Sequence, residues 1–485
     1  MDSPTLSLND LPVEILEQIF SYLPLSDRKA VSLVCQAWNE IVFSRRFMKS
    51  VALNVIMDWE QSQVHYLRAS TRRYRRVFIF LGPETCCEFD FTVIIEILDL
   101  FGNDLESFHC MSGFTEEQLW KVIIRAPNLQ QLIVGVDAES LKHERSFPVL
   151  GRLQDLGSLV NVLQIRGLDM PKLTQLSANF TTASDALGSI DLLRRLTPQL
   201  RNLELFSMEY YFSIDELRCP KVEVLKLAGQ ICAGSDLAVR SFFGGFQCLK
   251  DVRLEFNVTD RILDVITQTC PRIENLHFKS DLLSSDTFQL LERLKSLKTL
   301  SIMGSIDFRI ALECKPLVSV KRFRLQLVIL DDGTRIFGGF KKMLPNVNDI
   351  SVKLVTHVQP ERALVHVCRS FPHIRRLTIA DATTRIRMLS CTTFQNLRNL
   401  YRLEELTLKS IHVPVAFMHR NKCLKRLKIK YFHWLTDGDL IMLADLYPNL
   451  KYLELSWCRK VSIRGVEEFR ARLPDCVVHC IQSRL

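Results

Sequence analysis

The chain has 485 residues, with 63 Lys and Arg against 54 Asp and Glu, a formal charge of +9, and 47% apolar residues. These are the proportions of a globular protein, so they exclude a wholly disordered chain, a collagen-like repeat and a coiled-coil rod. A chain of this length exceeds one typical domain unless it is built from repeats, which grow without a single central core.

The first fifty residues carry apolar side chains at helical spacing. This spacing predicts helices over 12–23 and 28–43, in a compact unit of two or three helices. Pro12 suits a first helical turn, Pro24 ends that helix, and Ser26 can cap the next one. Further leucines, among them Leu8 and Leu25, lie outside the stripes. Because so small a unit rarely sustains a core alone, the surplus predicts a surface for a partner.

This segment resembles a known family. The order Leu11-Pro12, Glu14-Ile15, Phe20-x-x-Leu23-Pro24, Asp27-Arg28 and Val34-Cys35-x-x-Trp38 resembles an F-box. The resemblance implies docking onto the Skp-type adaptor of a cullin-RING ubiquitin ligase. It implies apolar contacts from Leu11, Pro12, Ile15, Leu25 and Val34, with Trp38 in either the interface or the small core. The alternative is an ordinary helical cap. We assign 6–48 to the F-box and 49–73 to a connecting segment.

Beyond residue 70 one short pattern returns: apolar, two variable, apolar, one variable, apolar. From 200 to 450 successive copies are 21 to 29 residues apart, the spacing of leucine-rich repeats. Each copy predicts a short strand with its last two apolar residues pointing inward, and helices are predicted between strands, as over 260–269 and 437–446. The clearest copies begin at Leu129, Leu200, Val222, Leu249, Ile273, Leu297, Val320, Val347, Ile374, Leu403, Leu424 and Leu450.

The predicted fold class is therefore α/β: a small helical F-box followed, over 74–485, by a leucine-rich-repeat solenoid. Its parallel strands form a curved sheet with helices on the convex side. The last repeats resemble the cysteine-containing repeats that commonly follow an F-box, although the turn Asn or Cys expected after the strand is found only at Asn257 and Cys458.

The register is ambiguous over 134–200. There Val160-Leu163-Ile165 competes with Leu173-Leu176-Ala178, and 177–185 is expected to be an irregular loop, either functional or a plain insertion.

Patterns for catalysis are absent, since no GxGxxG, GxxxxGK[ST], HExxH or GxSxG occurs. The histidines form no metal-ligand cluster, so we expect no active site, metal or cofactor. The 15 cysteines include no CxxC pair, which favours buried thiols in a reducing compartment, the cytoplasm or nucleus. The longest apolar run, 93–101, falls short of the roughly 20 residues that span a bilayer, so no membrane association is expected.

The positive charge is concentrated near the C-terminal end. Residues 374–460 hold 16 Lys and Arg against 7 Asp and Glu, which equals the whole excess of the chain. Strand-facing cations on successive repeats would form a patch. Three interpretations remain open: a dock for an acidic or phosphorylated target, a nucleic-acid contact, which the sequence makes unlikely, or a solvated strand face. The candidate residues are Arg324, Lys353, Arg376, Lys409, Arg426, Lys428 and Lys430, with Trp457 at the edge.

The sequence thus predicts a non-catalytic substrate receptor of an SCF-type ubiquitin ligase, bound through the adaptor to a cullin-RING core. The alternative is a repeat scaffold or transport adaptor that binds a protein partner without ubiquitination. The sequence does not identify the target.

Overall fold

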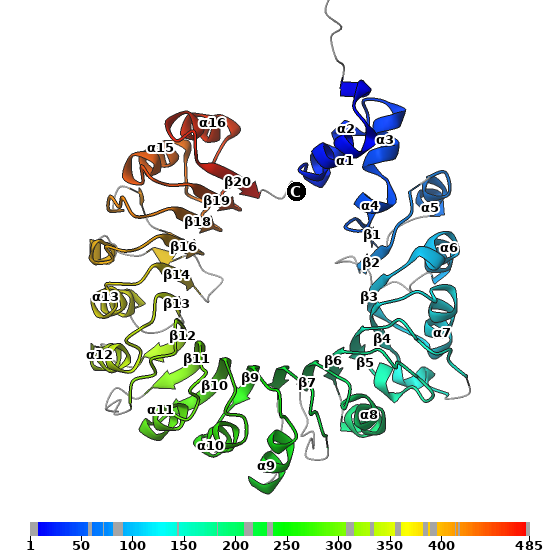
Figure 1. Ribbon diagram of the computed structural model, residues 1–485, viewed down its shortest axis with the longest axis horizontal. Coiled ribbons are helices and arrows are strands. Elements are labelled where there is room, and N and C mark those ends of the chain that lie inside the picture. Colours follow the sequence, from blue (N-terminus) through cyan, green and yellow to red (C-terminus); the bar gives the residue numbers. More distant parts are fainter. Residues whose placement is uncertain are drawn as a thin grey trace, which may run out of the picture. The chain divides into compact units, whose positions relative to one another are not determined.

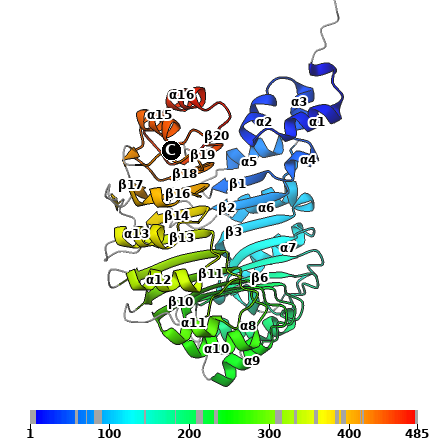
Figure 2. The ribbon, with the colours of Figure 1, turned by 60° about the vertical axis from the view of Figure 1, so that its left-hand side comes forward.

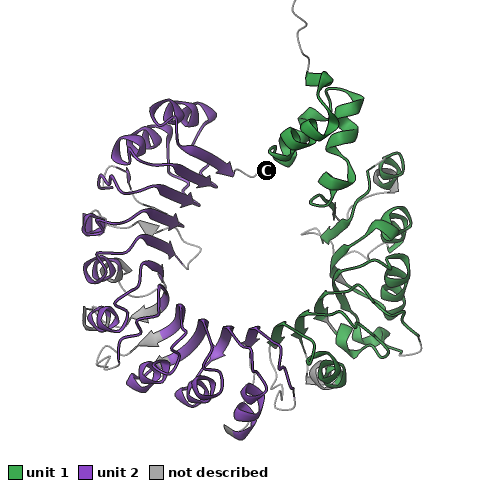
Figure 3. Cartoon of the chain, viewed as in Figure 1, with its two compact units in different colours: residues 1–212 green, residues 213–485 purple. Residues whose placement is uncertain are grey.

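The computed structural model describes most of the chain in two compact units, residues 1–212 and 213–485 (Figure 3). Each unit is described by itself. The described residues are 8–56, 61–70, 72–80, 91–142, 145–181, 183–207, 217–229, 236–306, 315–329, 334–354, 360–381, 387–388, 395–412, 414–415 and 418–481.

Unit 1 begins with short helices that pack on one another (Figures 1 and 2). The prediction of one helix over 28–43 is wrong: the chain turns after α2, and Cys35 is extended, with φ −157° and ψ 167°. This break lets α3 fold back so that Ile41 packs with Leu16 and Phe20 in the small core. Ser26 is no cap, since α2 already begins after Pro24. The helices are η1 (Leu8–Asp10), α1 (Val13–Ser21), α2 (Leu25–Val31), α3 (Gln36–Val42) and α4 (Arg45–Met48).

A parallel sheet fills the rest of unit 1. It starts earlier than predicted, because β1 lies inside the expected connecting segment 49–73 and pairs in parallel with β2. Leu53 and Val55 alternate inward on β1 and are buried, which joins this strand to the repeat core. The strands are β1 (Ala52–Ile56), β2 (Arg76–Phe80), β3 (Ser107–Phe114), β4 (Gln131–Val136), β5 (Asp155–Val160), β6 (Gln175–Phe180) and β7 (Asn202–Ser207). The helical segments are α5 (Gln61–Arg68), α6 (Phe91–Phe101), η2 (Gly102–Asp104), α7 (Glu116–Arg125), η3 (Ala138–Ser140), η4 (Val162–Gln164) and α8 (Ala183–Leu196).

Unit 2 continues with strand and helix in alternation. Within it the strand layer is curved and helices cover the convex side (Figure 1). The main strands are β8 (Val224–Gly229), β9 (Asp251–Asn257), β10 (Asn275–Leu283), β11 (Thr299–Ile306), β12 (Arg322–Ile329), β13 (Asp349–Leu354), β14 (Arg376–Asp381), β16 (Glu405–Lys409), β18 (Arg426–Lys430), β19 (Tyr452–Ser456) and β20 (Val477–Ile481), with a separate pair β15 (Arg387–Met388) and β17 (Ile411–His412). The helices are α9 (Asp236–Gly244), α10 (Asp260–Thr269), α11 (Ser285–Leu291), α12 (Thr334–Met343), α13 (Pro360–Ser370), η5 (Asn396–Asn399), α15 (Asp437–Leu446) and α16 (Ile463–Arg472).

The apolar anchors of the sequence pattern form the core of this solenoid. On β10 and β11, Leu276 pairs in register with Leu300 and Phe278 with Ile302, and all four side chains are buried. Their alternation on parallel strands stacks each repeat on the next. The expected helices over 260–269 and 437–446 are α10 and α15. The prediction of a helical N-terminal domain followed by a parallel-strand solenoid is therefore confirmed.

The ambiguous stretch 134–200 contains two further strands. β6 carries the Leu173-Leu176-Ala178 copy, whereas the competing Val160-Leu163-Ile165 copy is wrong, because η4 occupies its middle. The true neighbouring strand is β5, where Leu156 and Ser158 are buried, and Leu153 is buried in the turn before it. A serine at the last anchor hides this repeat from an apolar pattern.

The irregular loop expected over 177–185 is also wrong. β6 extends to Phe180 and α8 starts at Ala183, while Thr182 lies outside the described residues. Ala178 and Phe180 are buried on alternate positions, so small and polar residues in this stretch form regular structure.

Candidate functional site

The helices of residues 8–48 leave apolar side chains in solvent. Ile15 is 43% exposed and Val34 is 60% exposed, while Pro12 and Leu25 are also exposed. Several further apolar side chains are exposed here that the sequence pattern did not single out, of which Leu33 is 86% exposed. The apolar periodicity could have revealed Ile19, which follows Ile15 by one helical turn. The exposed residues that the sequence did not assign to this surface are Val13, Ile19, Tyr22 and Leu33, whereas Leu8, also exposed, was among the surplus leucines.

Two of the predicted contact residues belong mainly to the small core. Leu11 and Trp38 are half-buried against the cluster formed by Leu16 and Phe20. The Trp38 ring lies 5.3 Å from the Phe20 ring in an edge-to-face arrangement, and its Nε1 is buried without a hydrogen-bond partner among the described residues. Of the two roles that the sequence left open for Trp38, the structure supports packing in the core.

On the strand face of unit 2, three predicted cations already have acidic partners. Lys428 Nζ lies 2.7 Å from Glu405 Oε1, and Lys430 Nζ lies 2.6 Å from Glu454 Oε1. Arg376 Nε lies 3.0 Å from a carboxylate oxygen of Asp349. The acids come from neighbouring strands, so pairing cancels much of the field that a count of cations predicts. The cation patch expected on the strand face is therefore weakened at Arg376, Lys428 and Lys430, and its role in target binding stays a prediction.

Lys409, Arg426 and Trp457 lie in the same region in different surroundings. The Lys409 ammonium is 5.9 Å from the centre of the Tyr431 ring, and Tyr431 stacks on Trp457 with ring centres 6.0 Å apart. Both aromatic residues have a left-handed backbone, with φ 61°. Arg426 is exposed and forms no ion pair with a described residue. The predicted aromatic edge is thus a stacked pair.

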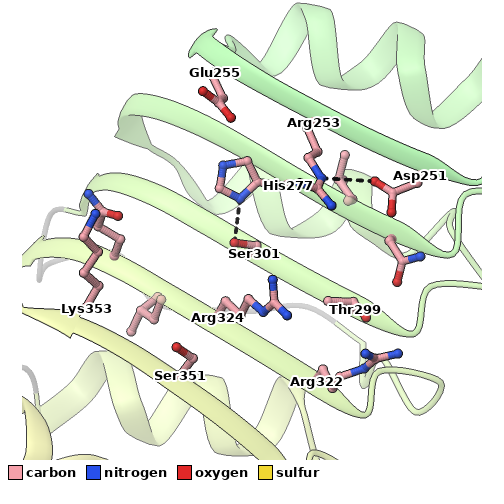
Figure 4. Close-up of a pocket in the computed structure, with 14 residues that line it drawn as sticks. Asp251, Arg253, Glu255, His277, Thr299, Ser301, Arg322, Arg324, Ser351 and Lys353 are labelled. Atoms are coloured by element: carbon pink, nitrogen blue, oxygen red, sulfur yellow. Dashed lines mark hydrogen bonds and ion pairs between the residues drawn. The ribbon is translucent and has the colours of Figure 1, made fainter. Parts of the chain in front are cut away.

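Arg324 and Lys353 lie in a pocket of about 430 Å³ on the strand face of β9 to β13 (Figure 4). Arg322 lines it too, and none of these three cations forms an ion pair with a described residue. We call this the strand-face pocket. Arg253 in the same pocket lies 3.5 Å from Asp251, and Glu255 lines its far side. The unpaired cations outnumber the unpaired acids, so the pocket attracts anions.

Polar groups lie between these charges. His277 Nδ1 and Ser301 Oγ are 2.6 Å apart (Figure 4). Burial lowers the pKa of His277; Arg253, Arg324 and Lys226 lower it further, and Glu255 opposes them. Thr299 is 8% exposed, and its hydroxyl oxygen is buried without a hydrogen-bond partner among the described residues. A neutral imidazole beside two hydroxyls and several cations suits anion binding by hydrogen bonds.

Over the described ranges, no group of three or more His, Cys, Asp or Glu side chains is placed to hold a metal ion.

Among the thiols, burial raises the pKa of Cys368 to about 12, so this side chain behaves as a small apolar group. Within the same ranges, no helix combines the length and apolar character needed to cross a membrane.

Comparison with known proteins points to the first of these surfaces. The family model described as F-box-like matches residues 8–54. A putative F-box protein of Arabidopsis thaliana is 33% identical over 76 residues, 16% of each chain. An F-box/kelch-repeat protein of the same plant is 44% identical over 46 residues, 10% of this chain and 11% of the relative. These matches span about a sixth or less of the relatives' length.

A solved structure, the yeast Rad7 and Elc1 complex, contains a chain that is similar over 98% of both chains, with 12% identity and a TM-score of 0.34. The family model, by contrast, matches a segment that includes the exposed apolar side chains of the N-terminal helices. Residues 8–54 of this chain are therefore an F-box-like domain.

Proposed function

We propose that this chain is the non-catalytic substrate-recognition subunit of an SCF-type ubiquitin ligase. The F-box-like domain would bind the Skp-type adaptor and, through it, a cullin-RING core. The repeats would hold the protein to be ubiquitinated. Such a subunit acts by proximity, because it holds a target lysine near the ubiquitin-loaded enzyme. This work belongs in the cytoplasm or nucleus.

The observation that carries the proposal is the exposed apolar face of residues 8–48. Ile15 and Val34 are exposed although Leu16 and Phe20 beside them are buried in a formed core. Burial of an exposed aliphatic side chain in an interface stabilises the complex by about 1.5 kcal/mol or more. Several such side chains on one small domain therefore favour a protein partner. Pro12 and Leu25 would add to this contact, and Leu11 and Trp38 would support it from the core.

The strand-face pocket is the place for a target. Arg322, Arg324 and Lys353 offer positive charge that no described acidic residue neutralises, and His277 and Ser301 offer uncharged polar groups. Charge-assisted hydrogen bonds from such cations are strong toward carboxylates and phosphates. An acidic or phosphorylated segment of the target fits this chemistry. Arg376, Lys428 and Lys430 would contribute less, because each already neutralises an acid.

Affinity purification of the chain from cells tests the adaptor contact. Ile15→Asp with Val34→Asp places charges on the exposed face and leaves Leu11 and Trp38 in the core. We expect the double variant to lose both adaptor and cullin, while the wild type retains both. Ile463→Asp is the matched control, since Ile463 is 80% exposed in unit 2. Adaptor recovery that is equal in all three proteins would contradict the proposal.

The second candidate function is a repeat scaffold that binds a protein partner without ubiquitination. The strand-face pocket favours this candidate, because binding of a partner there does not require a ligase. Inhibition of the proteasome distinguishes the two. A target of the ligase accumulates and gains ubiquitin only when the exposed face is intact. A partner of a scaffold keeps the same abundance in wild type and Ile15→Asp/Val34→Asp cells.

A further inference from the structure

A second pocket lies where one repeat is unusually short. The anchors Leu403 and Leu424 are 21 residues apart, whereas the next interval, to Leu450, is 26. Among the described residues between β16 and β18 there is no α-helix, although α15 fills the corresponding place in the next repeat. A pocket of about 240 Å³ is lined mostly by residues that precede β16 and β18, and we call it the short-repeat pocket.

The base of this pocket is apolar. Leu400, Leu403, Leu406 and Leu424 line it, and each belongs to the repeat core. A typical small-molecule pocket holds roughly 300 to 1,000 Å³. The short-repeat pocket is smaller than that range and matches one bulky apolar side chain.

The rim of the pocket is cationic. Arg398, Arg420 and Lys422 line it together with His419, and no acidic residue is among the lining residues. The three cations are exposed and form no ion pair with a described residue. The rim of this pocket therefore carries cations without a described acidic partner, while Lys428 and Lys430 on the strand face are neutralised.

A tyrosine also belongs to the wall of this pocket. Tyr447 lines the pocket and is 3% exposed. Burial alone raises the pKa of its hydroxyl, so it stays protonated and can donate. As a residue of the pocket lining, Tyr447 can offer a hydrogen-bond donor to a ligand oxygen.

We propose that the short-repeat pocket docks a peptide segment in which one bulky apolar side chain is flanked by acidic residues. The apolar side chain would fill the leucine-lined base, and the acidic residues would pair with Arg398, Arg420 and Lys422. The lining residues of this pocket belong neither to the strand-face pocket nor to the F-box-like domain. Binding of the peptide in this pocket does not depend on a role of the chain in ubiquitination.

Fluorescence anisotropy of the full chain tests the proposal with a labelled Glu-Glu-Phe-Glu-Glu peptide. The matched peptides are Glu-Glu-Ala-Glu-Glu, which lacks the anchor, and Lys-Lys-Phe-Lys-Lys, which reverses the charge. Burying a phenyl ring predicts that the first peptide binds at least about tenfold more tightly than the second. The third should not bind. Equal affinity for the Phe and Ala peptides, or no saturable binding of the Phe peptide, would overturn the proposal.

Variants locate the binding. Arg420→Glu with Lys422→Glu should weaken the Phe peptide about tenfold or more, because two charge-assisted contacts are reversed. Lys341→Glu with Lys342→Glu on α12 makes the same change of net charge elsewhere in unit 2 and should have no effect. An equal loss in both variants would show non-specific attraction and reject the pocket. Octanoate that displaces the peptide at lower concentration than unlabelled peptide would identify a fatty-acid site instead.

Cys423 offers a readout inside the pocket. Its thiol is exposed and lines the rim, whereas the exposed Cys480 lies outside the lining. Bound peptide should slow alkylation of Cys423 by N-ethylmaleimide and leave that of Cys480 unchanged. Unchanged alkylation of Cys423 at saturating peptide would contradict the assignment. Co-purification of the adaptor with the wild-type chain is a separate measurement. If the wild type does not retain the adaptor, the ligase function is rejected, but the peptide-binding result is unaffected.

Discussion

Lys430 on β18 and Glu454 on β19 form an ion pair across neighbouring strands, with Nζ 2.6 Å from Oε1. Glu454 is buried, and Ser456 donates a second hydrogen bond to the same carboxylate oxygen over 3.3 Å. Burial disfavours the charged form of Glu454, but the hydrogen bonds and the charges of Lys430 and Lys428 outweigh it and lower the pKa. Lys430, which the sequence assigned to target binding, is thus needed to neutralise a buried acid.

Replacing Lys430 tests this role. Lys430→Met keeps the aliphatic stem but leaves the Glu454 carboxylate buried without its cation. Removing one partner of such a pair costs about 3 kcal/mol. We expect slower-exchanging amides of β18 and β19 to lose protection in hydrogen exchange at pH 7. Lys409→Met is the control, because Lys409 is exposed beside an aromatic ring; an equal loss in that variant would contradict the explanation.

The contribution of the Lys430–Glu454 ion pair to the stability of the fold decreases in acid. Since the folded-state pKa of Glu454 lies below its ordinary value, the ion pair stabilises the fold above that ordinary value. The stabilisation is lost as the pH falls through the folded-state pKa. Replacement of Lys428 and Lys430 by Glu would therefore change the stability of the fold as well as any capture of a target. Arg322→Glu and Arg324→Glu, whose parent side chains have no acidic partner among the described residues, are the cleaner test of a target site.

Most of the fold could be predicted from the sequence because the repeat anchors are apolar and close in sequence. Leu276 and Phe278 illustrate this, since burial of both requires an alternating strand. The prediction failed where an anchor is polar, as at Ser158 on β5, and where a strand precedes the regular array, as with Leu53 on β1. At these two strands, hydrogen bonding to the neighbouring strand maintains the repeat fold, although the residue types do not match the apolar pattern.

The site could be predicted only in part. Exposure of Ile15 and Val34 agrees with the apolar surplus seen in the sequence. The electrostatics of the strand face could not be predicted, because the partners of Arg376 and Lys428 lie on strands more than twenty residues away. A count of cations along the chain contains no information on cross-strand pairing. Their assignment to target binding stays a prediction.

A glycine near the C-terminal end supports contact between two helices. Asp437 at the start of α15 accepts hydrogen bonds from the Ser462 amide over 2.8 Å and from its hydroxyl over 2.6 Å. These bonds lower the pKa of Asp437, so acid should weaken the contact as the pH falls below the ordinary carboxyl range. A Cβ on Gly465 would overlap the Asp437 carboxylate.

Gly465→Ala should therefore destabilise the contact of α15 with α16 by about 2 kcal/mol, since two hydrogen bonds to a charged group are disturbed. Hydrogen exchange of α16 measures the effect. Gly438→Ala is the matched control: a Cβ there meets nothing closer than Thr436 Oγ1 at 3.8 Å, so alanine should stabilise α15 by about 0.5–1 kcal/mol. Equal effects of the two substitutions would refute the steric argument.

His277 should make the strand-face pocket sensitive to acid. Its folded-state pKa is lowered, first by burial and then by neighbouring cations, so the unfolded chain takes up a proton at higher pH than the folded chain. Stability should consequently fall as the pH drops below about 6.5, the ordinary value for histidine. Urea unfolding of the wild type and His277→Gln at pH 7.5 and 5.5 measures this. A difference between the two proteins that does not change with pH would contradict it.

Trp38 separates the core of the F-box-like domain from its exposed face. Because its ring packs against Phe20 with centres 5.3 Å apart, Trp38→Ala should destabilise residues 13–48 by about 3 kcal/mol. Hydrogen exchange over α1 and α3 should show that loss, whereas Val34→Asp, at an exposed position, should leave exchange unchanged and still abolish adaptor binding. If Trp38→Ala abolished binding with unaltered protection of α1 and α3, the side chain would belong to the interface and the core assignment would fail.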